Sequence, residues 1–447
     1  MTKDIHDFGD KVHDKWSKEE YEQAATIAEE KGAGKYEMDE MEDESDDGSM
    51  VDEDSSDEME DGGDVDANVE LFGIKHHCPL NSLQSFHSLT GFPLDILHDI
   101  FEGVISEDLL GIIRILSAKN WFSIEEYNKS LLGLNYKSHE ASDKPQAVPI
   151  LNKPRKLNGK ACSIWVHMRN FPIAIRSFVK DKEDSALDLG LKLHEITERL
   201  TSGGFEEYEI DTLEELIVDY LDERKSLHGE HPGLLGTPKP KTHYLSHYPM
   251  AIRLYGPPMS YWTARYESRH RIAKNTAEAS KNFKNISLTV STRQQMRLSS
   301  VYYHGMFATT DLLILSKTSY KKSLVEDTSL QSVLPFMSDT DFLCSVVEFR
   351  SQVYKSGDLV VLEISGQDEI KVGLIVSILV RKESVLLVTR EFSATRNYLH
   401  FFQAQSDELT MTLNKADQLV DYKPLLNHGT PSQVFFCLHH HISFSHP

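Results

Sequence analysis

An acidic tract near the N-terminus, Glu37–Asp66, sets the strongest limit on what this chain can fold into. The tract contains 17 Asp and Glu residues, no Lys or Arg, and few apolar side chains. Its like charges repel one another, and its small apolar surface cannot offset the conformational entropy lost on folding. The sequence therefore predicts that the tract is disordered and that the fold is built from the remaining residues.

The same tract accounts for most of the net charge. The chain has 447 residues, 70 acidic and 47 basic, and a formal charge of −23; without the 17 acids of the tract, 53 acids face 47 bases, a charge of −6. The rest of the chain is nearly balanced, so its charge does not exclude contact with nucleic acid. The tract itself offers a binding surface for basic nuclear partners such as histone tails.

Two further features bear on cellular location. The first ten residues are charged, and no apolar run is long enough to cross a membrane, which predicts an intracellular protein without a membrane partner. Four scattered cysteines form no CxxC pair, so we expect reduced thiols rather than a structural zinc site or a disulfide framework.

Composition divides the chain into five segments and predicts an α+β fold. We expect a polar, helical segment at 1–36, the disordered acidic tract at 37–69, a mainly helical domain at 70–335, a small antiparallel β-barrel at 340–435, and a tail at 436–447. Apolar residues at helical spacing from Leu97 to Leu116 mark the start of the helical domain. Ser123 is expected to cap the next helix, and further helical patterns occur at 163–180, 185–202, 211–227 and 243–310.

The expected barrel rests on short runs of Val, Ile and Leu separated by turn residues. These runs are Val346–Tyr354, Asp358–Ile364, Lys371–Leu379 and Ser384–Thr389.

Three stretches carry more specific information. In the first, Asp95, His98, Asp99 and Glu102 share one face of the predicted helix. This pattern is typical of the solvated side of an amphipathic helix, but carboxylates clustered with a histidine also suit acid–base or metal chemistry.

The second stretch, Pro240–Pro249, contains His243 and His247 at a spacing that can bind zinc on a helix. No HExxH glutamate accompanies them, which favours structural or hydrogen-bonding histidines. The third stretch runs from Gly256 to Ile286, and the segment Arg265–Arg297 holds eight Lys or Arg residues and two acids. The alternatives there are a charged surface with pairs such as Glu267–Arg271, or a basic face that binds phosphate. Trp262, Tyr266 and Ile272 are expected to face the core.

In this order, the three stretches resemble the C-terminal half of transposases of the CACTA (En/Spm-like) superfamily, in the version found in animal genomes. The family pattern Phe-His-x-x-Thr-Gly-x-Pro-x-Asp-x-x-His-Asp-x-x-Glu-Gly is matched from Phe86 to Gly103. The elements Pro-Lys-x-His-x-x-x-His-Tyr-Pro, Gly-Pro, Trp, Arg-Tyr-Glu-x-x-His and Asn-Phe-Lys-Asn-Ile follow between Pro240 and Ile286. The resemblance covers residues 70–310, with a weaker family-like β segment after 340.

The resemblance implies an RNase H-like core that holds two metal ions on three carboxylates. Asp95 and His98 match the Asp-x-x-His signature that follows the second catalytic aspartate, and Glu267 is the candidate for the third carboxylate. The catalytic candidates are thus Asp95, His98 and Glu267. The mainly helical domain is then a remnant of this core with its helical insertion at 104–255, and a nuclear location is expected.

The sequence departs from the family upstream of Asp95, where the first catalytic aspartates should lie on strands. No strand-like run occurs before Leu71, and a paired-cysteine element of the family is missing. We therefore expect a truncated or domesticated derivative that is not an enzyme, has no cofactor, and retains surfaces for DNA or protein. One alternative is a component of a split or truncated metal-dependent transposase, for which Mg²⁺ or Mn²⁺ would be the cofactor; another is binding of basic nuclear partners by the acidic tract. Oligomeric state stays open.

Nucleic-acid contact, where it persists, is expected to be weak and sequence-independent, through side chains that neutralise phosphates. The residues expected to make it are Arg265, Arg269, Arg271, Lys274, Lys281, Lys284, Arg293 and Arg297.

Overall fold

The computed structural model describes residues 83, 91–150, 155–281, 284–303, 312–317, 342–366, 368–382, 384–405 and 410–442. Contacts divide the chain into two units, Met1–His77 and Cys78–Pro447, and every described residue belongs to the second unit. The expected N-terminal helical segment at 1–36 and the acidic tract at 37–69 lie outside the described residues.

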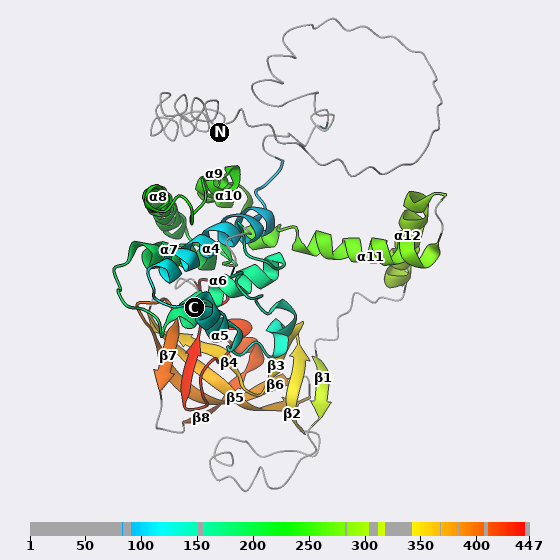
Figure 1. The fold of residues 1–447 in the computed structure, drawn as a ribbon. Helices are drawn as coiled ribbons and strands as arrows, with labels where there is room; N and C mark the ends of the chain where they lie inside the picture. Colours follow the sequence, from blue (N-terminus) through cyan, green and yellow to red (C-terminus); the bar gives the residue numbers. More distant parts are fainter. Residues whose placement is uncertain are drawn as a thin grey trace, which may run out of the picture. The chain divides into compact units, whose positions relative to one another are not determined.

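The described residues form an α+β fold in which helices precede an antiparallel sheet (Figure 1). The helical part begins with a π-helix, η2 (Leu97–Ile105), that continues directly into α4 (Ser106–Ala118). It goes on with α5 (Ile124–Leu132), the 3₁₀ turn η3 (Ser138–Asp143), α6 (Ala161–Ile175), α7 (Ser185–Leu200), α8 (Glu207–Glu230), α9 (Pro240–Tyr244), the 3₁₀ turn η4 (Leu245–His247), α10 (Tyr248–Tyr255), the 3₁₀ turn η5 (Pro258–Ser260), α11 (Ala264–Ser280) and α12 (Ile286–Tyr303).

Capping residues begin several of these helices. The Ser123 side chain accepts a hydrogen bond from the Glu126 amide, and the Glu126 carboxylate accepts one from the Ser123 amide, so the cap predicted for α5 is confirmed. Asp184 caps α7 by accepting from the amides of Ala186 and Leu187. Apolar side chains from η2 to α10 then form one continuous buried core.

A buried ion pair ties α4 to α8 inside this core. Arg224 donates from Nε to Asp108 Oδ2 and from Nη2 to Oδ1, both at 2.7 Å, and the Tyr220 hydroxyl donates to Asp108 Oδ2 at 2.5 Å. The side chains of Asp108 and Arg224 are 1% and 2% exposed. The pair fixes the end of the π-helix that carries the first motif, because α4 continues η2 without a break.

All pairings in the sheet are antiparallel, and they run in the order β1-β2-β5-β6-β7-β10, with β3 on β2, β4 on β5 and β9, and β8 on β6. The strands are β1 (Leu312–Lys317), β2 (Phe342–Phe349), β3 (Gln352–Lys355), β4 (Asp358–Ile364), β5 (Glu369–Arg381), β6 (Ser384–Arg396), β7 (Phe402–Gln405), β8 (Met411–Lys415), β9 (Asp421–Leu426) and β10 (Gln433–Phe436). The expected antiparallel sheet is confirmed. The pairings of the described strands leave it open and do not show the closed barrel expected at 340–435.

The first expected strand, Val346–Tyr354, is wrong as a single element. The chain reverses at Arg350 and Ser351, so β2 and β3 pair as a hairpin in which Phe349 lies opposite Gln352. Arg350 and Ser351 have φ angles of 49° and 64°, the left-handed values that a two-residue hairpin turn with matching twist requires at both positions. The sequence offers neither Gly nor Asn there, which is why the turn was not predicted.

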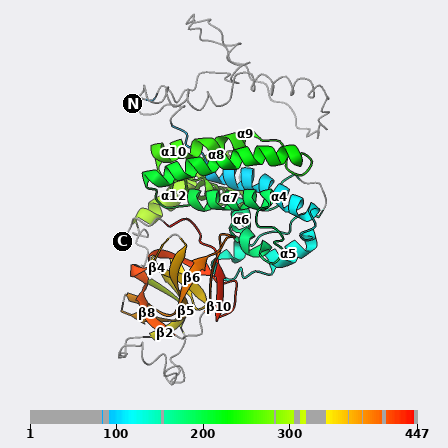
Figure 2. The same ribbon diagram turned by 90° about the vertical axis from the view of Figure 1, so that its left-hand side faces the viewer.

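Residues 437–442, expected to belong to a tail, return from the sheet to the helical part. Cys437 is buried in the helical core, and His439 Nδ1 lies 2.7 Å from a guanidinium nitrogen of Arg169 on α6. The His441 amide donates to the Glu198 carbonyl on α7 at 2.8 Å. Figure 2 shows helices and sheet as separate parts of this unit, and these contacts lie where the two parts meet.

None of the helices in the described ranges is both long and apolar enough to cross a membrane.

We predict that Asp108→Ala lowers the free energy of unfolding by about 3–5 kcal/mol, because it leaves the Arg224 guanidinium buried without its counter-charge. Denaturant unfolding of the purified chain measures the change. Arg253→Ala is the matched control, since Arg253 pairs with Glu207, Asp211 and Glu214 at the surface, where such pairs contribute about 1 kcal/mol or less. Equal losses for the two variants would contradict the importance of the buried pair.

Candidate functional site

The first motif lies on the π-helix η2 and on the residues just before it. Ile100, Phe101 and Val104 point into the helical core, whereas Asp95, His98, Asp99 and Glu102 are each partly exposed. The four polar residues therefore share one face, as the sequence predicts, although the helix is of the π type rather than the α type. Such π-helical turns are rare and occur frequently at functional sites.

Asp95 accepts hydrogen bonds from the distant residue Thr263 and from residues close to it in sequence. The Thr263 amide donates to Oδ1 at 3.1 Å, and both the Thr263 hydroxyl and His98 Nδ1 contact Oδ2. Burial of the carboxyl opposes its ionisation, but the hydrogen bonds from Thr263, His98 and the Leu97 amide together hold the pKa of Asp95 below its ordinary value. Asp95 is thus a carboxylate at neutral pH.

His98 joins Asp95 to Glu267. Its Nδ1 faces the Asp95 carboxylate, and its Nε2 lies 2.9 Å from Glu267 Oε1. The hydrogen bond to Asp95 raises the pKa of His98; burial opposes the rise, and the negative charges of Asp95, Glu267 and Glu102 add to it. The structure thus brings together all three residues that the sequence singles out as catalytic candidates, with the His98 imidazole between the carboxylates of Asp95 and Glu267.

This arrangement does not fit the metal ions that the resemblance implies. The carboxylates of Asp95 and Glu267 contact opposite nitrogens of one imidazole ring, so the ring separates them and they cannot share an ion. Within the described ranges no group of three or more His, Cys, Asp or Glu side chains converges in a way that could hold a metal.

Two residues that sequence reasoning missed hold this cluster in place. Thr263 precedes α11 and, instead of capping that helix, gives its amide and hydroxyl to Asp95. Lys241, at the start of the second motif, donates from Nζ to the His98 carbonyl at 2.7 Å. The Lys241 stem crosses Gly103 so closely that a Cβ at that position would lie 2.6 Å from Lys241 Cδ, which gives Gly103 of the first motif a packing role.

Aromatic packing anchors the same region from the core side. The ring of Phe101 stacks on Trp165 with centroids 5.4 Å apart, and Trp262 meets both rings edge-on at 6.4 Å. The sequence correctly assigns Trp262 to the core. Tyr266 was expected there too, but its side chain is 69% exposed, in the first turn of α11, where its neighbour Glu267 contacts His98.

We refer to α11 and α12 together as the arm. The two helices contact each other (Figure 1). Neither contains a buried residue. The eight basic residues expected to bind phosphate are all exposed side chains, seven on these helices or at the C-cap of α11 and one between them. They are Arg265, Arg269, Arg271, Lys274, Lys281, Lys284, Arg293 and Arg297.

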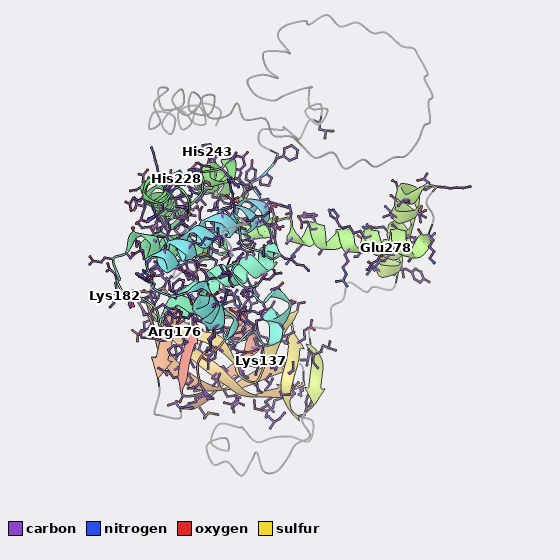
Figure 3. The ribbon with its side chains drawn as sticks, viewed as in Figure 1. Lys137, Arg176, Lys182, His228, His243 and Glu278 are labelled. Carbon is purple, nitrogen blue, oxygen red and sulfur yellow. The ribbon has the colours of Figure 1, made fainter. Side chains whose placement is uncertain are left out.

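The sequence offers the alternative that ion pairs on the helix surface neutralise these basic side chains, with Glu267–Arg271 as the named example. The structure does not contain that pair. Glu267 bonds to His98 and not to Arg271, although the two residues have the i,i+4 spacing. Glu278, the other acidic residue of α11, is labelled on the arm in Figure 3 and makes no ion pair with any described residue. Arg271 and Lys274 therefore keep their charges unpaired within the described part of the chain.

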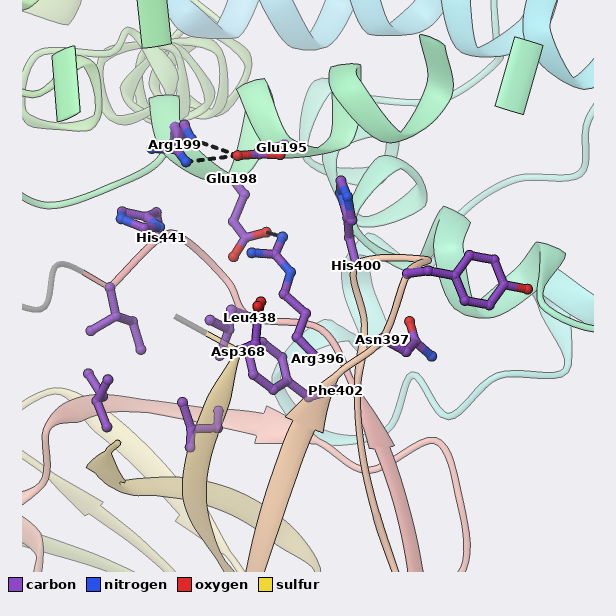
Figure 4. Close-up of a pocket in the computed structure, with 14 residues that line it drawn as sticks. Glu195, Glu198, Arg199, Asp368, Arg396, Asn397, His400, Phe402, Leu438 and His441 are labelled. Atoms are coloured by element: carbon purple, nitrogen blue, oxygen red, sulfur yellow. Dashed lines mark hydrogen bonds and ion pairs between the residues drawn. The ribbon is translucent and has the colours of Figure 1, made fainter. Parts of the chain in front are cut away.

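A separate pocket lies between α7 and the sheet (Figure 4), with a volume of 360 Å³. Its charged groups already bond to one another: Arg396 donates to Glu198 at 2.8 Å, and Arg199 donates to Glu195 at 2.8 Å. Burial raises the pKa of Glu198 against the effect of Arg396. None of the sequence-predicted site residues lines this pocket. The candidate site therefore remains the group formed by Asp95, His98 and Glu267, which we call the Asp95 cluster, together with the arm.

Comparison with known proteins adds no neighbour: no protein-family model, no curated protein and no solved structure matches the chain.

The pKa of His98 provides a test of this geometry. We predict that Asp95→Asn lowers that pKa more than Glu267→Gln does, because the Asp95 hydrogen bond is the largest contribution favouring the imidazolium. Each substitution removes a negative acceptor and so destabilises the protonated ring. Titration of the ring resonances by NMR measures both shifts, with His228, which bonds the Leu235 carbonyl at 2.7 Å, as the internal control. A larger shift in Glu267→Gln would contradict the arrangement.

Proposed function

We propose that this chain is a transposase-derived nuclear protein that binds the phosphate backbone of nucleic acid through the arm and does not cleave it. The observation that carries the proposal is the charge of the arm. Residues 264–303 contain eight Lys or Arg residues and two Glu, and one of these Glu residues is engaged by His98. Exposed cations on a segment with eight basic and two acidic side chains suit a polyanion.

The exposure of the arm supports a partner of this kind. Helices of this length are only marginally stable in water unless they pack against something. The arm contributes no buried residue to the described fold, and it also exposes large apolar side chains. The most exposed of these are Tyr266, Leu288, Met296, Tyr302 and Tyr303. Arginine and tyrosine side chains together favour contact with phosphates and with sugar or base surfaces.

The non-catalytic part of the proposal rests on the Asp95 cluster. A two-metal mechanism needs carboxylates that converge on the ions, whereas Asp95 and Glu267 are held apart by His98. The resemblance to CACTA transposases supports a DNA-related origin for the same residues. We infer that the family-equivalent carboxylates here brace the arm.

The proposal predicts weak, sequence-independent binding of duplex DNA that weakens as salt increases. Changing Arg271, Lys274 and Lys281 together to Ala should weaken binding and reduce the log–log salt slope by about one per lost phosphate contact. Fluorescence anisotropy at several salt concentrations measures both quantities. The matched control changes Lys129, Lys156 and Lys160, three exposed lysines outside the arm, to Ala. Equal affinities and slopes for the two triple variants would contradict binding through the arm.

The same samples distinguish the alternative functions. Incubation with Mg²⁺ or Mn²⁺ and a denaturing gel should show no nicking. Nicking that disappears in Glu267→Gln would instead support a component of a split transposase. Binding of basic peptides that is lost when residues 37–66 are deleted, without any DNA binding by the chain, would favour the acidic tract as the functional element.

A further inference from the structure

The histidine pair of the second motif has no part in the proposed function. His243 lies in α9, and His247 lies four residues later, at the end of η4. Their Nε2 atoms are 3.0 Å apart. The two rings are nearly perpendicular, with an interplanar angle of 89° and centroids 4.7 Å apart. The two ring nitrogens therefore lie next to each other at the protein surface.

Neither imidazole is buried in the core; the two rings hydrogen-bond to each other, which is the hydrogen-bonding alternative that the sequence offers. The adjacent residues Thr242 and Leu245 are buried, while His243 is exposed and His247 is half-buried. Figure 3 labels His243 on α9, among the helices drawn at the top of the view. A structural histidine of this chain looks different: His167 is 2% exposed, and its Nε2 bonds a tyrosine hydroxyl at 2.9 Å. Within the described residues, the ring nitrogens of His243 and His247 make one hydrogen bond, which is the contact between their two Nε2 atoms.

The separation of the two nitrogens matches that of neighbouring ligands on one metal ion. Two imidazoles bound at about 2.0–2.1 Å lie about 2.9 Å apart when the angle at the metal is a right angle and about 3.4 Å apart when it is tetrahedral. We propose that His243 and His247 form a two-histidine surface site for a borderline divalent transition metal, namely Zn²⁺, Ni²⁺ or Cu²⁺, with water in the remaining positions.

The chemistry of the pair selects this class of metal. Imidazole suits Zn²⁺, Ni²⁺ and Cu²⁺, whereas Mg²⁺ prefers oxygen ligands and keeps its waters. In the metal-free pair, one ring donates its Nε2 proton to the other. Binding moves that proton to Nδ1 of the same ring through solvent, and each Nε2 then gives a lone pair to the metal in place of a water. The number of protons on the pair does not change.

The site would join two turns that support the first motif. A metal held by His243 and His247 cross-links α9 to η4, and α9 carries the Lys241 side chain that donates to the His98 carbonyl. Binding at the pair therefore stabilises the turn that packs against η2. This inference does not rest on DNA binding by the arm, because it uses neither α11 nor α12.

Carbethoxylation of histidines tests the site directly in the full, untagged chain. Peptide mass spectrometry reports the modification of each histidine separately, which is necessary because the chain contains 21 of them. Zn²⁺ at micromolar concentration should protect His243 and His247 together, and Mg²⁺ should protect neither. Unchanged modification of both residues in Zn²⁺ would overturn the proposal without any substitution being made.

A matched pair of variants gives the second readout. Isothermal titration with Zn²⁺ should show that His247→Gln loses one equivalent of bound metal relative to the unaltered chain. His228→Gln should lose none, because His228 Nδ1 faces the Leu235 carbonyl at 2.7 Å. Retention of the full stoichiometry and affinity in His247→Gln would assign the metal to other histidines and overturn the proposal.

Discussion

The carboxylate of Asp95 joins two segments of the chain that are 168 residues apart in sequence. It accepts from the amide and hydroxyl of Thr263, directly before α11, and from His98, whose other nitrogen contacts Glu267 in the first turns of α11. The base of the arm is thereby fixed to η2. Farther along, the arm makes no buried contact of its own. Its position relative to the helical core depends on these hydrogen bonds and on the packing of Trp262.

Several residues of the transposase-like pattern are far apart in the sequence but close together in the structure. Asp95 and His98 come from the first stretch, Lys241 from the second, and Glu267 from the third, and all meet at η2. Together they hold the base of the arm, a basic pair of helices, at η2. We infer that the arrangement serves binding rather than strand cleavage, because an imidazole occupies the space between the two carboxylates.

Much of this arrangement could be predicted from the sequence where local signals decide the structure. The polar face around Asp95 and the cap at Ser123 both follow from spacing and side-chain chemistry. Predictions failed where tertiary contacts decide. The turn at 350–351 adopts left-handed backbone without Gly or Asn, and Tyr266 is exposed in the first turn of α11 although the sequence places it in the core. The contact of Thr263 with Asp95 had no signal in a single sequence, since hydroxyl residues before helices usually act as caps.

Amide hydrogen exchange along α11 tests the bracing role of Asp95 most directly. In the unaltered chain, residues 264–271 should exchange more slowly than residues 286–303, because the former are held to η2 and the latter are not. Asp95→Ala should remove that difference while leaving the exchange of α6 and α7 unchanged. Slow exchange of 264–271 that persists in Asp95→Ala would contradict the claim that this carboxylate holds the arm.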